Sequence, residues 1–164
     1  GSLICADKIL SKNKCIISYA DIFYEKEAID ILNKSKRGRG ITILSYKHWR
    51  KYWKERFQNP LTDLETFRAN NQNQLVEIGN RTNSYKDIRG QYMGVFKIDP
   101  ISWNNIKKKL FKEKKNLNKI DITALFQLII REKICNIYVE NYKKKWFEID
   151  NNKDYKVFRK YIEK

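Results

Sequence analysis

The chain has 164 residues, with 35 Lys and Arg against 19 Asp and Glu, so its formal net charge is +16. Its length suits one domain with a core of its own, and a hydrophobic content of 41% excludes a disordered chain. No apolar run approaches the ~20 residues of a membrane-spanning helix, and no signal peptide opens the sequence. We therefore expect a cytoplasmic protein without membrane insertion, with one domain over residues 1–164.

Histidine and cysteine usage excludes several kinds of chemistry. The three cysteines fit neither a disulfide framework nor a zinc site, and His48 is the only histidine, so a His-based triad has little to draw on. Neither of the Gly-rich phosphate loops, GxxxxGK[ST] and GxGxxG, occurs in the sequence. A Gly-flanked Ser or Cys nucleophile is absent as well.

The charge excess raises the question of a polyanionic partner, either nucleic acid or an anionic surface. Basic and aromatic residues interleave over 47–57, which is typical of surfaces that bind single strands. The same spacing places Trp49, Trp53 and Phe57 along one face of a helix, and such a stripe more often packs into a core. The lysines are spread along the whole chain, as a compositional bias would produce. A non-catalytic, basic binding module is therefore the alternative hypothesis.

The hydrophobic pattern alternates helical and extended segments, and this alternation predicts an α/β fold. In the first half we expect a helix over 2–11, a strand over 15–20 that is buried on both faces, a helix over 25–34, a strand over 41–45, and the aromatic helix over 47–57. In the second half we expect a hairpin from 66–69 and 74–78, a strand over 91–98, a helix from Pro100, and a Lys-rich helix and loop over 104–119. A helix capped by Asp121 follows, with Leu125, Leu128, Ile129 and Ile130 on its apolar face, and then strands over 137–139 and 146–149 and a closing helix. These elements predict a mostly parallel sheet with helices on both faces and a β-hairpin insertion.

Two aspartates follow predicted strands. Asp21 comes after the run 16–20, and Asp150 comes after 146–149. The carboxyl ends of parallel strands define the ligand crevice of an open sheet, where two carboxylates can share a Mg²⁺ ion. Alternatively, each aspartate caps a following helix, and this applies more strongly to Asp150, which a helix follows directly. The spacing leaves both interpretations open.

Two glycine-bearing strings, 77–81 and 90–94, are also unusual. Glycines near strand ends let the backbone approach a ligand closely, and Arg81 is suited to holding a phosphate. Ordinary turn chemistry is the alternative interpretation.

Several strings, taken together and in this order, resemble a known family. They are Ser18-Tyr19-Ala20-Asp21-Ile22, Arg56-Phe57-x-Asn59-Pro60-Leu61-x-Asp63-x-Glu65, Glu77-Ile78-Gly79, Gly90-Gln91-Tyr92-Met93-Gly94 and Trp146-x-Glu148-Ile149-Asp150. They are similar to motifs of the bacterial phosphocholine and phosphonate cytidylyltransferases of the sugar-phosphate nucleotidyltransferase superfamily. The resemblance extends over nearly the whole chain and implies a Rossmann-like nucleotidyltransferase sheet.

The resemblance implies a role for each matched residue. Asp21 and Asp150 match the two aspartates that bind the catalytic Mg²⁺. Residues expected on the acceptor side are Asp121 and Thr123, from a D-x-T string, together with Glu77, Arg81 and Tyr92.

The implied reaction is nucleotidyl transfer. A phosphate or phosphonate oxygen of a small acceptor attacks the α-phosphorus of CTP in line, and pyrophosphate leaves, so no protein nucleophile is required. The usual setting of the resembling enzymes is the decoration of cell-surface polysaccharide or lipid.

Two departures from the family pattern matter. Gly79-Asn80-Arg81 stands where many relatives carry Gly-Lys-Lys, so one positive charge is missing on the acceptor side. The strand and the Gly-rich loop that hold the CTP phosphates in relatives are not found. We therefore expect the C-terminal portion of a longer nucleotidyltransferase domain, without its first βα units and inactive alone.

Overall fold

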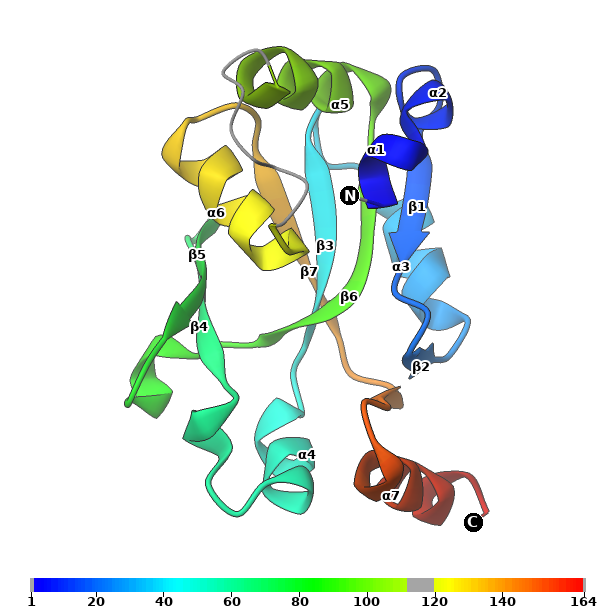
Figure 1. Cartoon of the computed structure of the whole chain (residues 1–164), viewed down its shortest axis with the longest axis vertical. Helices are drawn as coiled ribbons and strands as arrows, with labels where there is room; N and C mark the ends of the chain where they lie inside the picture. Colours follow the sequence, from blue (N-terminus) through cyan, green and yellow to red (C-terminus); the bar gives the residue numbers. More distant parts are fainter. Residues whose placement is uncertain (1, 112–119, 164) are drawn as a thin grey trace.

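The computed structural model describes residues 2–111 and 120–163, and at its centre is a four-stranded sheet (Figure 1). The strand order is β1-β6-β3-β7, with bounds β1 (Cys15–Ser18), β6 (Gln91–Ile98), β3 (Ile41–Tyr46) and β7 (Ile137–Tyr142). Helices flank this sheet, so the expected α/β class is confirmed.

The expectation of a mostly parallel sheet is wrong for the described strands. Of the three pairings, only β3 with β7 is parallel, while β6 runs antiparallel to both β1 and β3. The reason is the edge at which β6 begins: Gln91 pairs with Tyr46, the last residue of β3, so β6 has to run back along it. The strands β1, β3 and β7 share one direction, and their carboxyl ends therefore meet at one edge of the sheet.

The sheet separates two hydrophobic cores, as the two-residue period of strands requires. In β3, Ile41 and Ile43 belong to one core and Leu44 to the other. The first core is covered by α5 (Pro100–Ile106) and α6 (Ile122–Arg131). Asp99 caps α5 by accepting a hydrogen bond from the Ser102 N–H at 2.9 Å. The deepest residues of α6 are Phe126 and Ile129, so the expected apolar face is right at Ile129, whereas Leu125 and Leu128 lie at the margin of the core.

The second core lies under α3 (Glu27–Lys34), α4 (Trp49–Arg56) and α7 (Asn152–Ile162). Trp49 is 3% exposed and Trp53 is 4% exposed, so the aromatic stripe of α4 packs into the core. Trp53 stacks on Trp146, with ring centroids 5.8 Å apart. The core-packing interpretation of this stripe is confirmed.

The hairpin is also confirmed, as β4 (Glu65–Ala69) and β5 (Leu75–Arg81). Two expectations near the N-terminus are wrong. The first helix is interrupted at Ala6, giving α1 (Ser2–Cys5) and α2 (Asp7–Leu10), and β1 is a half-buried edge strand rather than one buried on both faces. The remaining elements are the ribbon of β2 (Ile22–Tyr24) with β8 (Trp146–Glu148), the 3-10 turns η1 (Pro60–Thr62) and η2 (Tyr85–Asp87), and the π-helical turn η3 (Lys107–Phe111).

The expected Lys-rich segment is described only in part. Helix α5 continues into η3, and residues 112–119 of that prediction lie outside the described residues. Among the helices that the structure describes, none is both long and apolar enough to cross a membrane.

Candidate active site

The short β2–β8 ribbon brings the two strand-end aspartates into one place. Ile22 pairs with Glu148, and one step beyond, the Ile149 N–H donates to the Asp21 carbonyl oxygen at 2.9 Å. Asp21 and Asp150 thus leave neighbouring strands at the same end of the ribbon. The Asp21 side chain is exposed, and that of Asp150 is 51% exposed.

Neither aspartate caps a helix, so that alternative is wrong for both. Asn151 is the cap of α7, where its side chain accepts hydrogen bonds from the N–H groups of Lys153 and Asp154. Helix α3 begins at Glu27, with Lys26 before it, well past Asp21.

A buried arginine at the end of α4 holds three carboxylates. The side chain of Arg56 is 1% exposed, and its guanidinium lies 3.0 Å from Glu148, 2.7 Å from Asp150 and 2.8 Å from Asp154. Burial alone would lower the pKa of Arg56, but its carboxylate partners raise it overall, so it stays charged. Asp154 is itself 3% exposed and also accepts a hydrogen bond from the Asp150 N–H. Arg56 thereby fixes the position of Asp150.

Further carboxylates surround Tyr19, the residue two before Asp21. Burial raises the pKa of Tyr19, and the negative charges of Asp121, Glu148, Asp21 and Glu65 raise it further. Burial also raises the pKa of Glu148, and the pKa of Glu65 is raised by burial and then by the charges of Asp121 and Asp63. We call the group Asp21, Glu65, Asp121, Glu148 and Asp150, with Tyr19 and Arg56, the acidic site.

A hollow of about 500 Å³ opens beside the acidic site, and Tyr19, Asp21 and Asp121 line it. Asp121 is the cap of α6, as expected: it accepts hydrogen bonds from the Ala124 N–H at 2.7 Å and from the Thr123 hydroxyl at 3.0 Å. The D-x-T string therefore has a local structural role and also places a carboxylate at the hollow.

Tyr92 packs against this region from β6. Its ring meets Tyr19 edge to face, with centroids 6.0 Å apart, and burial raises its pKa well above the usual range. Within the described residues, the Tyr92 hydroxyl is buried without a hydrogen-bond partner. Such a group is costly in a folded protein unless a ligand or water satisfies it.

Two of the three glycines of the unusual strings, Gly79 and Gly94, lie inside strands, so the turn interpretation is wrong for them, whereas Gly90 directly precedes β6. Gly94 has φ +74°, and a Cβ there would lie 2.8 Å from the Tyr19 ring. Gly79 has φ +81°, and a Cβ there would lie 2.8 Å from the Gln127 side-chain nitrogen. Both positions need glycine because a neighbouring side chain approaches a left-handed backbone. Gly94 in particular admits the ring of Tyr19.

The structure places two of the predicted residues, Glu77 and Arg81, on the β4–β5 hairpin. Glu77 accepts a hydrogen bond from Arg68 at 2.6 Å, across the β4–β5 hairpin. Arg81 ends β5 opposite Glu65 and is exposed. Asp21, Asp150, Asp121 and Tyr92 are thus brought together, whereas Glu77 belongs to the hairpin.

Sequence reasoning did not single out Arg56, Glu148, Glu65 or Tyr19 as site residues. A signal for Arg56 exists, namely a charged residue on the buried side of an aromatic helix. The carboxylates at 148, 150 and 154, on either side of a helix start, are the matching signal for its partners.

A divalent cation at this site would need a suitable set of carboxylate donors. Among the described residues there is no group of three or more His, Cys, Asp or Glu side chains arranged to hold a metal. Mg²⁺ is commonly held by one or two carboxylates, with waters and substrate phosphates completing its shell. The pair Asp21 and Asp150 meets that smaller requirement, because both carboxylates are accessible and the strand ends that carry them lie side by side.

Comparison with solved structures defines the class of fold. The chain matches an inositol-1-phosphate CTP transferase from T. maritima with a TM-score of 0.69 at 18% identity, covering 96% of this chain and 58% of that one. It matches a glucose-1-phosphate thymidylyltransferase from Bacillus anthracis, determined with a sucrose, with a TM-score of 0.65 at 11% identity, covering 95% and 57%. The fold is thus the Rossmann-like fold of the nucleotidyltransferases.

Sequence comparison narrows the class. No family model matches the chain. It is 33% identical over 156 residues to the CTP:phosphoglutamine cytidylyltransferase of Campylobacter jejuni, a match that covers 91% of this chain and 60% of that protein. The chain is thus related to the cytidylyltransferases, as its motifs predicted, and it spans about 60% of the length of this curated relative.

Proposed function

We propose that the protein carrying this chain transfers a cytidylyl group from CTP to a small phosphorylated or phosphonate acceptor and releases pyrophosphate. The observation that carries the proposal is the Ile149–Asp21 hydrogen bond of 2.9 Å, which joins the two strand ends that bear Asp21 and Asp150. The relationship to the cytidylyltransferases supports the type of reaction. We place the reaction in the cytoplasm, which supplies CTP, and its product in the decoration of cell-surface glycan or lipid.

The chain's own residues have distinct roles in this proposal. Asp21 and Asp150 hold Mg²⁺, and Arg56 orients Asp150 while compensating the charge of the buried Asp154. A bound Mg²⁺ supplies positive charge to the nucleotide phosphates and helps to align the reacting groups. The acceptor oxygen is itself the nucleophile, so the protein contributes position and electrostatics rather than a covalent intermediate.

The acceptor is proposed to enter the hollow beside Tyr19. Glu65 and Asp121 make this region negative, which suits an acceptor whose far end carries hydrogen-bond donors or a positive charge. The buried Tyr92 hydroxyl, which lacks a partner among the described residues, is a candidate contact for such an acceptor. Choline phosphate, an aminoalkyl phosphonate and an amide-bearing phosphate meet this description, and the name of the Campylobacter relative favours the last.

The test is pyrophosphate release from CTP and Mg²⁺ by the full-length protein, with each acceptor supplied in turn. We expect Asp21→Asn and Asp150→Asn each to lower the rate about 100-fold or more, as loss of transition-state charge stabilisation does in other enzymes. Asp30→Asn, on α3, is the matched control and is expected to keep the wild-type rate. Asp21→Asn is the decisive variant, because the Asp21 carboxylate makes no ion pair or hydrogen bond with the other described residues, so its loss should not affect the fold. Full activity of Asp21→Asn would rule out the metal assignment.

A further inference from the structure

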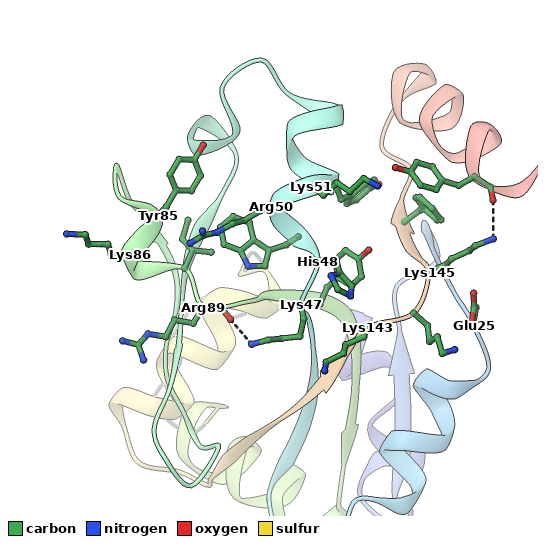
Figure 2. A pocket seen from close by; sticks show the side chains of 17 residues that line it. Glu25, Lys47, His48, Arg50, Lys51, Tyr85, Lys86, Arg89, Lys143 and Lys145 are labelled. Atoms are coloured by element: carbon green, nitrogen blue, oxygen red, sulfur yellow. Dashed lines mark hydrogen bonds between the residues drawn. The ribbon is translucent and has the colours of Figure 1, made fainter. Parts of the chain in front are cut away.

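A second hollow, of about 1050 Å³, lies at the carboxyl ends of β3 and β7, apart from the acidic site (Figure 2). Three loops form it: the entry to α4, the segment around η2, and the turn between β7 and β8. None of Asp21, Asp150 or Arg56 lines it. We call it the basic pocket.

Eight Lys and Arg side chains line the basic pocket, and every one of them is exposed. Glu25 is the single carboxylate among the lining residues, and Glu55 lies nearby, where it accepts a hydrogen bond from the Tyr161 hydroxyl. The basic residues are Lys47, Arg50, Lys51, Lys86, Arg89 and the run 143–145.

Carboxylates of the described residues do not pair with these eight charges. Within residues 2–111 and 120–163, none of the eight forms an ion pair. Lys47 and Lys145 donate instead to backbone carbonyls, those of Arg89 and Tyr161, at 3.1 Å each (Figure 2). A concave surface lined by one sign of charge concentrates the field and attracts ions of the opposite sign. A general bias toward lysine does not explain why so many meet around one hollow.

The pocket is held in shape by aromatic packing behind the charges. Trp49 stacks on Tyr85 with centroids 6.2 Å apart, and Arg50 lies over both rings, 5.2 Å from the centroid of Trp49. Tyr46 packs on Trp146 at 5.3 Å, and the Lys47 N–H donates to the Tyr142 carbonyl oxygen at 3.0 Å. Rings and backbone therefore tie the loops together and hold the basic residues around one hollow.

The same packing argues against single-stranded nucleic acid as the ligand. Strand-binding surfaces offer open aromatic faces on which bases stack. Here Trp49 is 3% exposed and Tyr52 is 5% exposed, and the more exposed Tyr85 is stacked on Trp49 with Arg50 over its ring, so these rings offer little open face. The hollow is also close in size to ordinary small-ligand pockets, which run up to about 1,000 Å³. A compact ligand fits better than an extended strand.

We infer that the basic pocket is a second binding site, and that its ligand is a compact polyanion with two or more linked phosphate groups. Inorganic polyphosphates and nucleoside triphosphates share this chemistry. Exposed Lys and Arg side chains from three loops can contact several phosphates at once through charge-assisted hydrogen bonds. The inference does not depend on the proposed transferase activity, because it concerns binding at residues outside the acidic site.

The test is calorimetric titration of the protein with inorganic tripolyphosphate, without Mg²⁺, at low and moderate salt. The triple variant Lys47→Gln, Lys143→Gln, Lys145→Gln removes three of the pocket charges. Its matched control removes three exposed charges elsewhere, as Lys8→Gln, Lys12→Gln, Lys14→Gln. Both variants lose the same net charge, so only position differs.

We expect the pocket variant to bind tripolyphosphate about tenfold or more weakly than wild type, since one charge-assisted hydrogen bond is worth about that factor. The control is expected to stay within about twofold, and thermal unfolding without ligand should show both variants folded. CTP and ATP, titrated next into wild type and the pocket variant, separate the sources by the affinity that the variant loses: equal losses for the two nucleotides indicate recognition of phosphate alone, and unequal losses indicate recognition of a nucleotide. Either result supports the site.

Three outcomes would overturn the inference. The first is no detectable binding of any of these polyphosphates at moderate salt. The second is an equal loss of affinity in both triple variants, which would mean attraction by net charge alone. The third is tighter, pocket-dependent binding of a single-stranded oligonucleotide or of anionic phospholipid vesicles, which would assign the pocket to a macromolecular partner.

Discussion

Helix α4 has a charged region at each end, and the two regions differ in how their charges are compensated. At its start, the basic pocket gathers eight exposed cations, none of which forms an ion pair among the described residues. At its end, Arg56 is buried and meets three carboxylates. A buried charge has to be paired for the protein to fold, whereas exposed charges in water do not. The fold therefore needs the paired charge of Arg56 at the end of α4. It does not need the exposed charges at the start of α4, which we infer bind a ligand.

The comparison also shows why the net charge of +16 says little about function. The proposed reaction centre lies in the acidic part of this basic protein, around Asp21 and Asp150. Most of the excess charge is spread along exposed surfaces, whereas eight of the described cations gather around the basic pocket. The local arrangement of the charges, rather than the net charge, distinguishes a binding site from a compositional bias.

The largest effect on the free energy of unfolding is expected from replacing Arg56, the buried cation of the acidic site. Arg56→Met leaves the buried Asp154 without a partner and also frees Glu148 and Asp150. Breaking a buried pair in this way costs about 3–5 kcal/mol, so urea unfolding should show a loss of that order. Arg159→Met is the control, because its pair with Glu163 is more than half exposed and is worth about 1 kcal/mol or less. Equal losses in the two variants would remove the distinction drawn between buried and exposed charges.

A smaller effect is expected at Gly94, which admits the ring of Tyr19 into the acidic site. Gly94→Ala places a Cβ 2.8 Å from that ring on a backbone with φ +74°. The strain should lower the free energy of unfolding by about 1–3 kcal/mol. Gly38→Ala is the matched control, because its Cβ would meet only the Tyr138 hydroxyl, at 3.5 Å. If both variants unfold at the same urea concentration, Gly94 is not needed for close approach.

Local features of the fold were predictable from the sequence, and long-range pairings were not. The hairpin and the buried face of α4 follow from spacing within a few residues. The direction of β6 depends on where the hairpin returns the chain, and the β2–β8 ribbon pairs three-residue strands from opposite ends of the sequence. Strands of that length carry no periodic signal.

The candidate active site shows the same division between local features and long-range contacts. Resemblance to a family singled out Asp21 and Asp150, whose strand ends the structure brings together, and their metal-binding role stays a prediction. The burial of Arg56 has a signal in its own helix, but its partners do not follow from that signal, because they lie more than ninety positions later in the chain. The basic pocket was hidden for a similar reason, since its three loops are distant in sequence.

The smallest effect concerns pH and separates the acidic site from the basic pocket. Burial, together with the charges of Asp121 and Asp63, raises the pKa of Glu65 in the folded state. The unfolded chain therefore releases this proton first, and folding loses stability as the pH rises from about 4 through the folded pKa. Glu65→Gln removes this loss, so its stability relative to wild type should increase from about pH 4 to about pH 7, by less than the Gly94 effect.

The basic pocket supplies the contrasting control for that experiment. Lys144→Gln removes one of several like charges, so it should also stabilise the fold slightly. Its advantage should fade with added salt, which screens exposed charges. Paired urea titrations at both pH values and at two salt concentrations measure all four responses. A Glu65→Gln advantage that disappears with salt and not with acid would show that Glu65 behaves as an exposed charge, and the acidic site would then be no more sheltered from water than the basic pocket.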